Sequence, residues 1–451
     1  MTGADRAVLA EEIVRRLAAA LRGAQLYAPG HPLVARSIAA LAETLSLTLA
    51  NTPSVTIGIV GDDLVVGDFP IPRAAETMGE LMRRLKQAGI ERIVIQRGVE
   101  ADEVDRLVAS VASGETGKDG VLGKLPHVRV GRIEVEEKIE GVGDMAAFKK
   151  LYAEASGVAS VLLESAAVEG KPDADAARSM VDSLAQAVAQ NRTALLALTA
   201  LKNYDNYTFT HMVNVSILTM GQARGLGIEG GLLREFGLAA LMHDIGKVKT
   251  PLEILNKPDK LTADEFAIMK LHTINGAEML RMTPDIAALA PVVAFEHHLR
   301  LDGSGYPDGA KRPTLNVGTM LCGIADVYDA MRSQRAYQQA FPTDRILEVL
   351  KRNDGKQFDQ HLVRRFVQLI GIYPAGNVVR LNTGEIGVVL HVHAPDPYRP
   401  RVRIVVDPDG YRLDDPYDVN IWEQTDDPSR ATTVVAPIDS TDYHFDPLAV
   451  M

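Results

Sequence analysis

The chain has 451 residues, a formal net charge of −11 at pH 7 and 46% hydrophobic residues. This length suggests about three domains with sizeable cores, and the acidic balance excludes a general nucleic-acid binder, which needs a broad basic surface. The N-terminus mixes acidic residues into an amphipathic pattern, and no uninterrupted apolar run approaches the roughly 18 residues of a membrane span. We therefore expect a cytoplasmic protein that contacts neither nucleic acid nor membrane. The single cysteine, Cys322, excludes an intrachain disulfide.

Residues 1–143 mix helical and extended patterns. Two stretches of helical apolar spacing come first, separated by the turn signal APGHP, and SVTIGIVGDDLVVGDFP then predicts a hairpin. Helix, strand, helix and strand patterns follow in turn, and this alternation predicts a small α/β domain. Because we see no catalytic constellation in it, we expect this domain to regulate activity or mediate association, with a homodimer as one form of association.

The rest of the chain changes texture twice. Residues 146–371 are dominated by helical periodicity, which predicts an all-α core. Residues 372–435 alternate β-branched residues with Gly, Asn and Pro turns, which predicts a small antiparallel β module. We expect residues 436–451 to form a loose tail. The predicted fold is thus multidomain, with a helical core between an N-terminal α/β domain and a C-terminal β module.

Five of the eleven histidines fall between positions 211 and 298, each in a helical context. A single histidine on a helix is usually a core or surface residue, but this set recurs on consecutive apolar helices together with two aspartates. Packed together without partners, these groups would carry a heavy desolvation cost. Metal ions remove that cost, because neutral imidazoles and carboxylates are their natural ligands. The candidate ligands are His211, His243, Asp244, His272, His297, His298 and Asp326.

The residue types in this set also indicate the metal. With no thiolate present, mixed nitrogen and oxygen ligands favour iron, manganese or another hydrolytic transition metal over structural zinc. His243 and Asp244 are adjacent, so a single turn can offer one ring and one carboxylate to a shared centre. A carboxylate can bridge two ions roughly 3.5–4 Å apart, and such a pair lowers the pKa of a bridging water and clamps a phosphoryl oxygen. This spacing is typical of two-metal hydrolases.

Six motifs occur in order over about residues 175–371: DNYTFTH, HDIGK, HTINGAEML, HHLRLDGSGYP, IADVYDAMRSQRAY and FDQHLVRRF. HDIGK together with HHLRLDGSGYP resembles the HD-GYP subgroup of the HD phosphohydrolases, the bacterial cyclic di-GMP phosphodiesterases. The HD pair alone is a weak signal, but the ordered set is very specific. The resemblance implies an HD-type helical core and an enzyme that hydrolyses cyclic di-GMP to pGpG, and further to GMP, through a metal-bridging hydroxide.

The resemblance also assigns the ligands, position by position, to two divalent transition metals, iron or manganese. The residues that resemble the ligands of one ion are His211, His243, Asp244 and Asp326. Those that would hold the second ion, with Asp244 bridging, are His272, His297 and His298. Asp244 and Lys247 take the catalytic roles, because Lys247 matches the family lysine that assists at the scissile phosphate.

Substrate contacts follow from the same resemblance. The DGSGYP loop would lie near the substrate and would also dock a GGDEF-type cyclase or another signalling protein. Arg335 corresponds to the family's phosphate-binding arginine, whose planar fork suits two phosphate oxygens. The implied substrate-binding residues are Lys247, Gly305, Tyr306, Pro307, Arg332 and Arg335.

The chain departs from the family pattern at four positions. Leu299 replaces the Glu that commonly follows the histidine pair, and Gln338 and Gln339 replace basic residues, which would weaken substrate affinity. Tyr207 stands where some members carry a Glu ligand for a third metal, so we expect two metals here. Two alternatives stay open: a catalytically weak cyclic dinucleotide receptor that signals through its flanking domains, and a phosphodiesterase for another cyclic dinucleotide.

Overall fold

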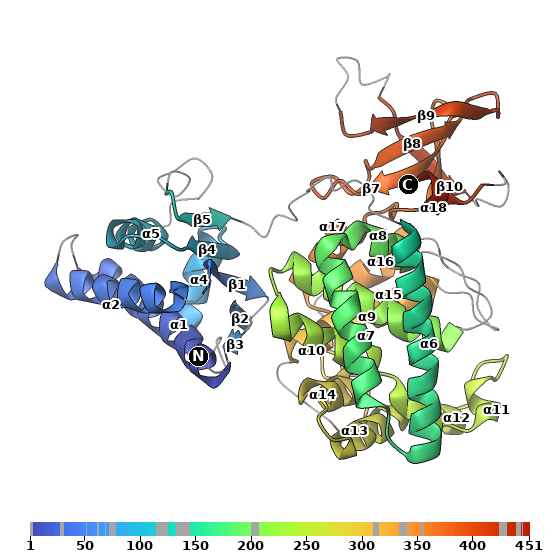
Figure 1. Ribbon diagram of the computed structural model, residues 1–451, viewed down its shortest axis with the longest axis horizontal. Coiled ribbons are helices and arrows are strands. Elements are labelled where there is room, and N and C mark those ends of the chain that lie inside the picture. The colour runs from blue at the N-terminus through green and yellow to red at the C-terminus, as the bar shows by residue number, and fades with distance from the viewer. Residues whose placement is uncertain are drawn as a thin grey trace. The chain divides into compact units, whose positions relative to one another are not determined.

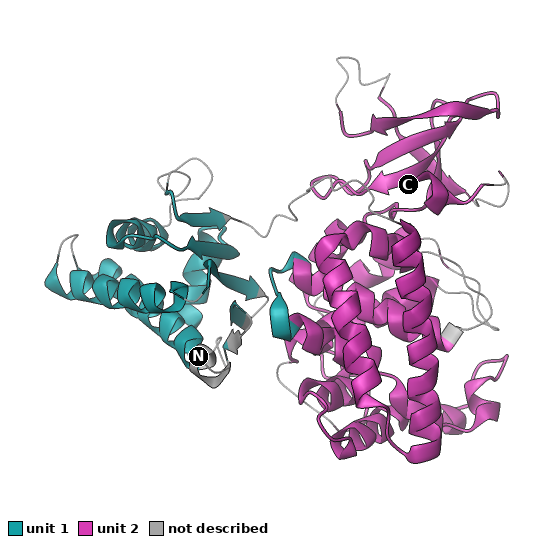
Figure 2. Ribbon diagram, in the orientation of Figure 1, with its two compact units in different colours: residues 1–136, 225–232 teal, residues 137–224, 233–451 magenta. Residues whose placement is uncertain are grey.

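Two compact units make up the chain in the computed structural model: residues 1–136 with 225–232, and residues 137–224 with 233–451 (Figure 2). The structure describes residues 3–27, 31–50, 52–60, 63–67, 69–71, 78–113, 125–131, 145–199, 207–309, 315–332, 341, 343–352, 356–423, 431–438, 443 and 445–451.

The N-terminal unit combines a five-stranded sheet with helices α1, α2 and α5, which pack together beside it (Figure 1). The strand order is β3-β2-β1-β4-β5 and all neighbouring strands are antiparallel, whereas the predicted alternation of helices and strands usually builds a parallel sheet. The mixture of helices and strands is as predicted. The elements are α1 Gly3–Leu26, α2 Pro32–Leu49, β1 Ser54–Val60, β2 Asp63–Val66, β3 Phe69–Ile71, α4 Gly79–Gln87, β4 Arg92–Gln96, α5 Ala101–Ser113 and β5 Val128–Gly131.

A buried carboxylate joins α5 to the start of β5. Glu103 accepts hydrogen bonds from the backbone N–H of His127 at 2.8 Å and of Glu100 at 3.0 Å, and its Oε2 lies 2.9 Å from the His127 ring nitrogen Nδ1. Burial raises the pKa of Glu103, but these hydrogen bonds outweigh burial and hold that pKa below its usual value of 4.5. The ionised carboxylate therefore fixes the last strand of the sheet to the helix.

The helical core begins at α6 and carries every predicted metal ligand. Helices α6, α7, α16 and α17 each bury one apolar face, as their periodicity predicts, whereas α9 and α15 are buried on nearly all sides at the centre of the core. The elements are α6 Met145–Glu169, α7 Ala174–Gln190, α8 Arg192–Thr199, α9 Tyr207–Gly225, α10 Gly230–Leu241, η2 Ile245–Lys249, α11 Leu252–Leu255, α12 Ala263–Lys270, α13 His272–Met282, α14 Leu289–Glu296, α15 Val317–Arg332, α16 Thr343–Arg352 and α17 Gln360–Ile370. A helical core of this kind confirms the predicted all-α centre of the chain.

Several of these helices start at capping residues that are visible in the sequence. The Asp173 side chain accepts backbone hydrogen bonds at the start of α7, and the Asp359 side chain does so at the start of α17. Thr262 and Glu265 form a reciprocal capping box at the start of α12. Each cap satisfies N–H groups that have no partner within the helix, and so fixes where the helix begins.

The C-terminal sheet is antiparallel, with strand order β10-β6-β7-β8-β9. Its elements are β6 Val378–Leu381, β7 Ile386–His391, β8 Arg401–Val406, β9 Arg412–Asn420, β10 Val434–Ile438 and the short helix α18 Pro447–Val450. The predicted loose tail is wrong for the described part of that segment. Strand β10 continues to Ile438 beside β6, Leu448 is buried, and Asp446 pairs with Lys149 of α6 at 2.8 Å. These contacts lie far apart in sequence, so local composition did not reveal them.

Two helices, α2 and α6, are long and apolar enough to cross a membrane by length and composition alone. Each buries one stripe within the protein: α2 buries Val34, Ile38 and Leu41, among others, and α6 buries Tyr152, Ala155, Ala159, Leu162 and Ala166. Amphipathic helices of folded domains have this pattern, so neither helix is clear support for a membrane span.

Candidate metal centre

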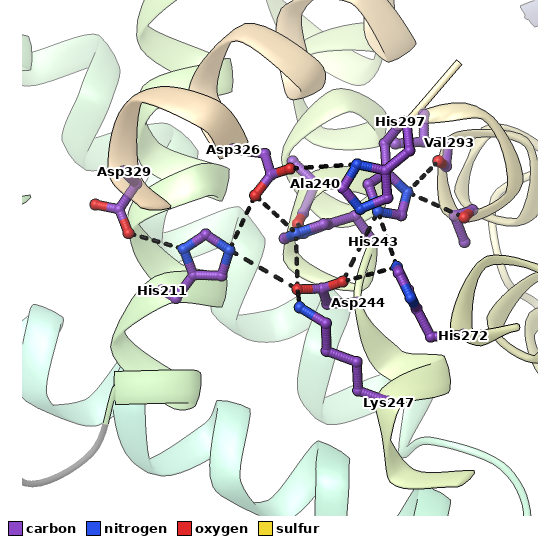
Figure 3. A network of polar contacts seen from close by, with 12 residues as sticks. His211, Ala240, His243, Asp244, Lys247, His272, Val293, His297, Asp326 and Asp329 are labelled. Atoms are coloured by element: carbon purple, nitrogen blue, oxygen red, sulfur yellow. Dashed lines mark hydrogen bonds and ion pairs between the residues drawn. The ribbon is translucent and has the colours of Figure 1, made fainter. Parts of the chain in front are cut away.

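The seven predicted ligands come from several elements of the core and meet in one cluster, and Figure 3 labels all of them except His298. Helix α9 supplies one, the turn between α10 and η2 supplies two, the start of α13 and the end of α14 supply three, and α15 supplies one. Their ligand atoms form two groups, and within each group all atoms lie within 4.8 Å of one another. One group is His211, His243 and Asp326, and the other is Asp244, His272, His297 and His298.

Two histidine rings in the second group face each other through nitrogen atoms that cannot bond to one another. The Nδ1 atom of His272 lies 2.7 Å from the Met269 carbonyl oxygen, and that of His297 lies 3.0 Å from the Ala294 carbonyl oxygen. Each Nδ1–H therefore donates to a carbonyl, and each Nε2 presents a lone pair. The two Nε2 atoms lie 3.3 Å apart. Two buried lone pairs at this distance require a positive charge that both can share.

The protonation states agree with that reading. Burial lowers the pKa of His272, and burial together with the neighbouring His298 ring lowers the pKa of His297 well below its usual value. A proton shared between the two Nε2 atoms would make one ring cationic, and the lowered pKa values oppose this. The rings are therefore held neutral, which is the form that binds metals.

Asp244 lies between the two groups, as Figure 3 shows. Its Oδ1 is 3.3 Å from His272 Nε2, while its Oδ2 is 3.3 Å from His243 Nε2 and contacts the Lys247 ammonium. Burial raises the pKa of Asp244, but the charge of Lys247 and the nearby His243 ring outweigh burial and hold that pKa well below its usual range. The carboxylate is therefore ionised, with one oxygen facing each group.

The first group has the same organisation. His243 Nδ1 lies 2.7 Å from the Ala240 carbonyl oxygen, which turns Nε2 towards the carboxylates. His211 Nε2 lies 3.2 Å from Asp326 Oδ1. Burial lowers the pKa of His211, but Asp326 and Asp329 outweigh burial and raise it to about 9. The two carboxylates thus favour positive charge at His211, which a bound cation would also supply.

Close backbone packing positions Asp244 beside α13. A Cβ atom at Gly246 would lie closer than 3.0 Å to the His272 carbonyl oxygen and to the backbone of Gly276. Only glycine at position 246 allows η2 to approach α13 this closely. The glycine of HDIGK therefore sets the short distance between Asp244 and His272.

The loop after α14 folds back over His298. Leu299 and Gly305 form an isolated antiparallel bridge, and Gly305 has φ of +95°. A Cβ atom there would lie closer than 3.0 Å to the His298 carbonyl oxygen, so the turn requires glycine. The ring centroids of Tyr306 and His298 lie 4.4 Å apart, and the following Pro307 is buried after a cis peptide bond. The loop thus sets an aromatic side chain beside the metal centre.

The remaining predicted residues differ in how the structure places them. Lys247 is at the centre, with 24% of its side chain exposed. Arg332 instead faces Asp329, with Nη2 3.5 Å from Oδ1, and covers the Tyr328 ring. Its substrate-binding role stays a prediction. The predicted residues outside the described ranges are Arg335, Gln338 and Gln339, together with the side chain of Tyr207.

Sequence reasoning missed Asp329. This residue of α15 is fully buried and its Oδ2 lies 2.8 Å from His211 Nδ1. A carboxylate behind a ligating histidine fixes the tautomer and orientation of the ring. The signal was present in the sequence, because Asp329 follows Asp326 by three residues and the two must share a helix face.

The residues fit a divalent cation. Imidazole rings held from behind by carbonyl or carboxylate acceptors, with ionised carboxylates between the rings, make up the ligand set of a divalent-metal site. A family model described as "HD domain" matches residues 183–362, and one described as "KOW domain associated with HD domain" matches residues 378–426. The helical core thus matches the HD-domain family over residues 183–362.

Relatives of this HD domain are known enzymes. A cyclic di-GMP phosphodiesterase of Pseudomonas aeruginosa is 40% identical over 228 residues, which cover 51% of this chain and 55% of that protein. Another, from Thermotoga maritima, is 36% identical over 174 residues, or 38% and 47% of the two chains. A 3'3'-cGAMP-specific phosphodiesterase of Vibrio cholerae is 31% identical over 172 residues, or 37% and 40%. The chain spans about half the length of these curated relatives.

Proposed function

We propose that the chain is a metal-dependent phosphodiesterase that hydrolyses cyclic di-GMP. The observation that carries the proposal is the pair of opposed Nε2 atoms of His272 and His297, 3.3 Å apart, with the two oxygens of Asp244 facing different ligand groups. A site that only recognised a nucleotide would not need buried lone pairs directed at one another. The names of the similar proteins support the choice of substrate class.

We assign two divalent transition metals to the centre, iron or manganese. His211, His243, Asp244 and Asp326 would hold one ion, and His272, His297 and His298 would hold the other with Asp244 shared. Mixed imidazole and carboxylate ligands suit these metals. When bound, such ions lower the pKa of a water molecule and stabilise negative charge on a phosphoryl group.

The side chains around the centre would orient the substrate. The Lys247 ammonium contacts Asp244 and is partly exposed, so it can meet a phosphate oxygen while it stays at the centre. Tyr306 covers His298 and offers a ring face to a guanine base. Attack of one water molecule on a phosphorus atom breaks one P–O3′ bond and gives linear pGpG, and a second hydrolysis gives GMP.

A reconstitution assay tests the proposal. Protein stripped of metal should be inactive, and addition of Mn²⁺ or Fe²⁺ should restore conversion of cyclic di-GMP to pGpG, followed by chromatography of the products. Metal content measured on the same samples should approach two ions per chain. A protein that holds both ions but converts no cyclic di-GMP would refute the enzyme and favour the nucleotide receptor.

A second candidate substrate is 3'3'-cGAMP, because a similar protein of Vibrio cholerae carries that specificity in its name. Rates on the two cyclic dinucleotides, measured side by side at equal metal loading, distinguish them. We expect faster turnover of cyclic di-GMP. Docking of a GGDEF-type cyclase on the DGSGYP loop (residues 302–307), homodimer formation and a cytoplasmic location remain predictions.

A further inference from the structure

A chain of buried hydrogen bonds connects α6 with the metal centre. The Tyr152 hydroxyl donates to Asn214 Oδ1 at 2.7 Å, and Asn214 Nδ2 donates to Asp329 Oδ1 at 2.9 Å. The other oxygen of Asp329 accepts from His211 Nδ1 at 2.8 Å. All four side chains are buried. The three bonds therefore form one continuous path from α6 to a metal ligand.

Helical spacing explains why these groups meet. Asn214 follows His211 by three residues on α9, and Asp329 follows Asp326 by three residues on α15. Residues three apart share a helix face. Helices α9 and α15 thus meet through two pairs of side chains. Asn214 is hydrogen-bonded to Asp329, and the candidate ligands His211 and Asp326 contact each other.

Asp329 sets the direction of the two hydrogen bonds of Asn214, and Tyr152 completes the pair. An amide can present either its oxygen or its nitrogen, and a reversed Asn214 would set its oxygen against the carboxylate of Asp329. The carboxylate only accepts hydrogen bonds, so Nδ2 turns towards Asp329 and Oδ1 is left facing α6, where the Tyr152 hydroxyl donates to it and holds the amide in place. Burial raises the pKa of Tyr152, which keeps the hydroxyl protonated. With Asp329 held by Asn214, its second oxygen holds the His211 ring.

A packing role alone does not account for the hydroxyl. The Tyr152 side chain is 4% exposed and belongs to the buried stripe of α6, where phenylalanine would pack as well without a polar atom to satisfy. Tyr152 also lies before residues 183–362, the part that matches the HD-domain model. A helix outside that match thus contributes to the orientation of one ligand.

We propose that Tyr152 is a positioning residue that acts through Asn214 and Asp329 to fix His211 for metal binding. The proposal rests on the metal centre of the proposed function but not on its substrate. It predicts that removal of the hydroxyl weakens the ion held by His211, His243 and Asp326 and leaves the other ion unchanged.

Calorimetric titration of the metal-free full chain with Mn²⁺ tests this. Substitution of carboxylates behind metal ligands typically lowers metal affinity about 10–100-fold, so we expect Asp329→Asn to fall in that range at one of two sites. Tyr152→Phe acts through two further bonds, and we expect about a 3–10-fold loss at the same site. The site is identified by pairing: Tyr152→Phe should still weaken binding in a His272→Ala background and should add nothing in a His211→Ala background.

Leu162→Val is the matched control. Leu162 is buried on the same face of α6 but is not part of the hydrogen-bonded path. This variant should lower the melting temperature of the metal-free protein without changing Mn²⁺ affinity. Unchanged affinity in Tyr152→Phe, or an equal loss in Leu162→Val, would overturn the proposal. If the titrations behave as expected while the loaded protein hydrolyses no cyclic dinucleotide, the proposed function fails and the positioning role stands.

Discussion

Replacement of Asp244 by asparagine is the sharpest test of a shared carboxylate. In the structure, Oδ1 lies 3.3 Å from His272 Nε2, and Oδ2 contacts the Lys247 ammonium and lies 3.8 Å from His211 Nε2. An amide keeps one oxygen acceptor and replaces the other with a donor. The amide of the Asp244→Asn variant would therefore serve one ligand group and direct N–H groups at the other.

The expected loss is large. A bound divalent ion lowers the pKa of its water from about 15.7 to about 7, so the loss of one ion removes most hydroxide available at neutral pH. We expect kcat to fall at least about 10³-fold, which corresponds to about 4 kcal/mol of transition-state stabilisation. The change is nearly isosteric and the helices pack through apolar faces, so the metal-free variant should have the same circular dichroism as the wild type.

The assay combines product chromatography, metal content and circular dichroism on the same samples. Asp308→Asn is the matched control, because Asp308 is an exposed carboxylate that pairs with Lys270 and belongs to neither ligand group. It should keep full activity and both ions. A folded Asp244→Asn protein that binds two ions and turns over cyclic di-GMP at the wild-type rate would refute the shared-carboxylate argument.

Three further outcomes can be checked directly. Gly305→Ala should reduce activity more than about tenfold, because the added Cβ would meet the backbone carbonyl of His298. Gly303→Ala is its control: Gly303 also has positive φ, but a Cβ there would have no atom within 4 Å, so this variant should lose only about 1–2 kcal/mol of stability in thermal unfolding. Lys247→Met should lower kcat about 10²-fold while metal content is unchanged, as expected for one lost donor at a developing charge. The pKa of Glu103 is held below 4.5, so its carboxylate contributes stability above about pH 4.5 that is lost as the pH falls through the lowered pKa. The Glu103→Gln variant should therefore be about 1–3 kcal/mol less stable than the wild type at pH 7. Its stability should also fall less steeply than that of the wild type below pH 4.5, and identical pH profiles for the two proteins would contradict this.

The residues of the metal centre were accessible from the sequence because their signal is local. HDIGK and the adjacent pair His297 and His298 carry their meaning in residue type and short spacing, and helical periodicity predicted the core that holds them. The structure brings all seven candidates together, and their roles as ligands stay predictions. The motifs did not predict which oxygen of Asp244 faces which ligand group, because that depends on how closely η2 approaches α13.

Tertiary contacts decided the features that no local pattern encodes. Tyr152 and Asp329 lie far apart in the sequence, and only the packing of α6, α9 and α15 joins them through Asn214. The same reason explains the end of the chain, where a loose tail was predicted but β10 pairs with β6 and Asp446 pairs with Lys149. Periodicity and turn chemistry act within a few residues and therefore determine helices, strands and caps. Which buried polar group meets which partner is a property of the packed interior, where an unpaired group is costly and the partner can come from any part of the chain.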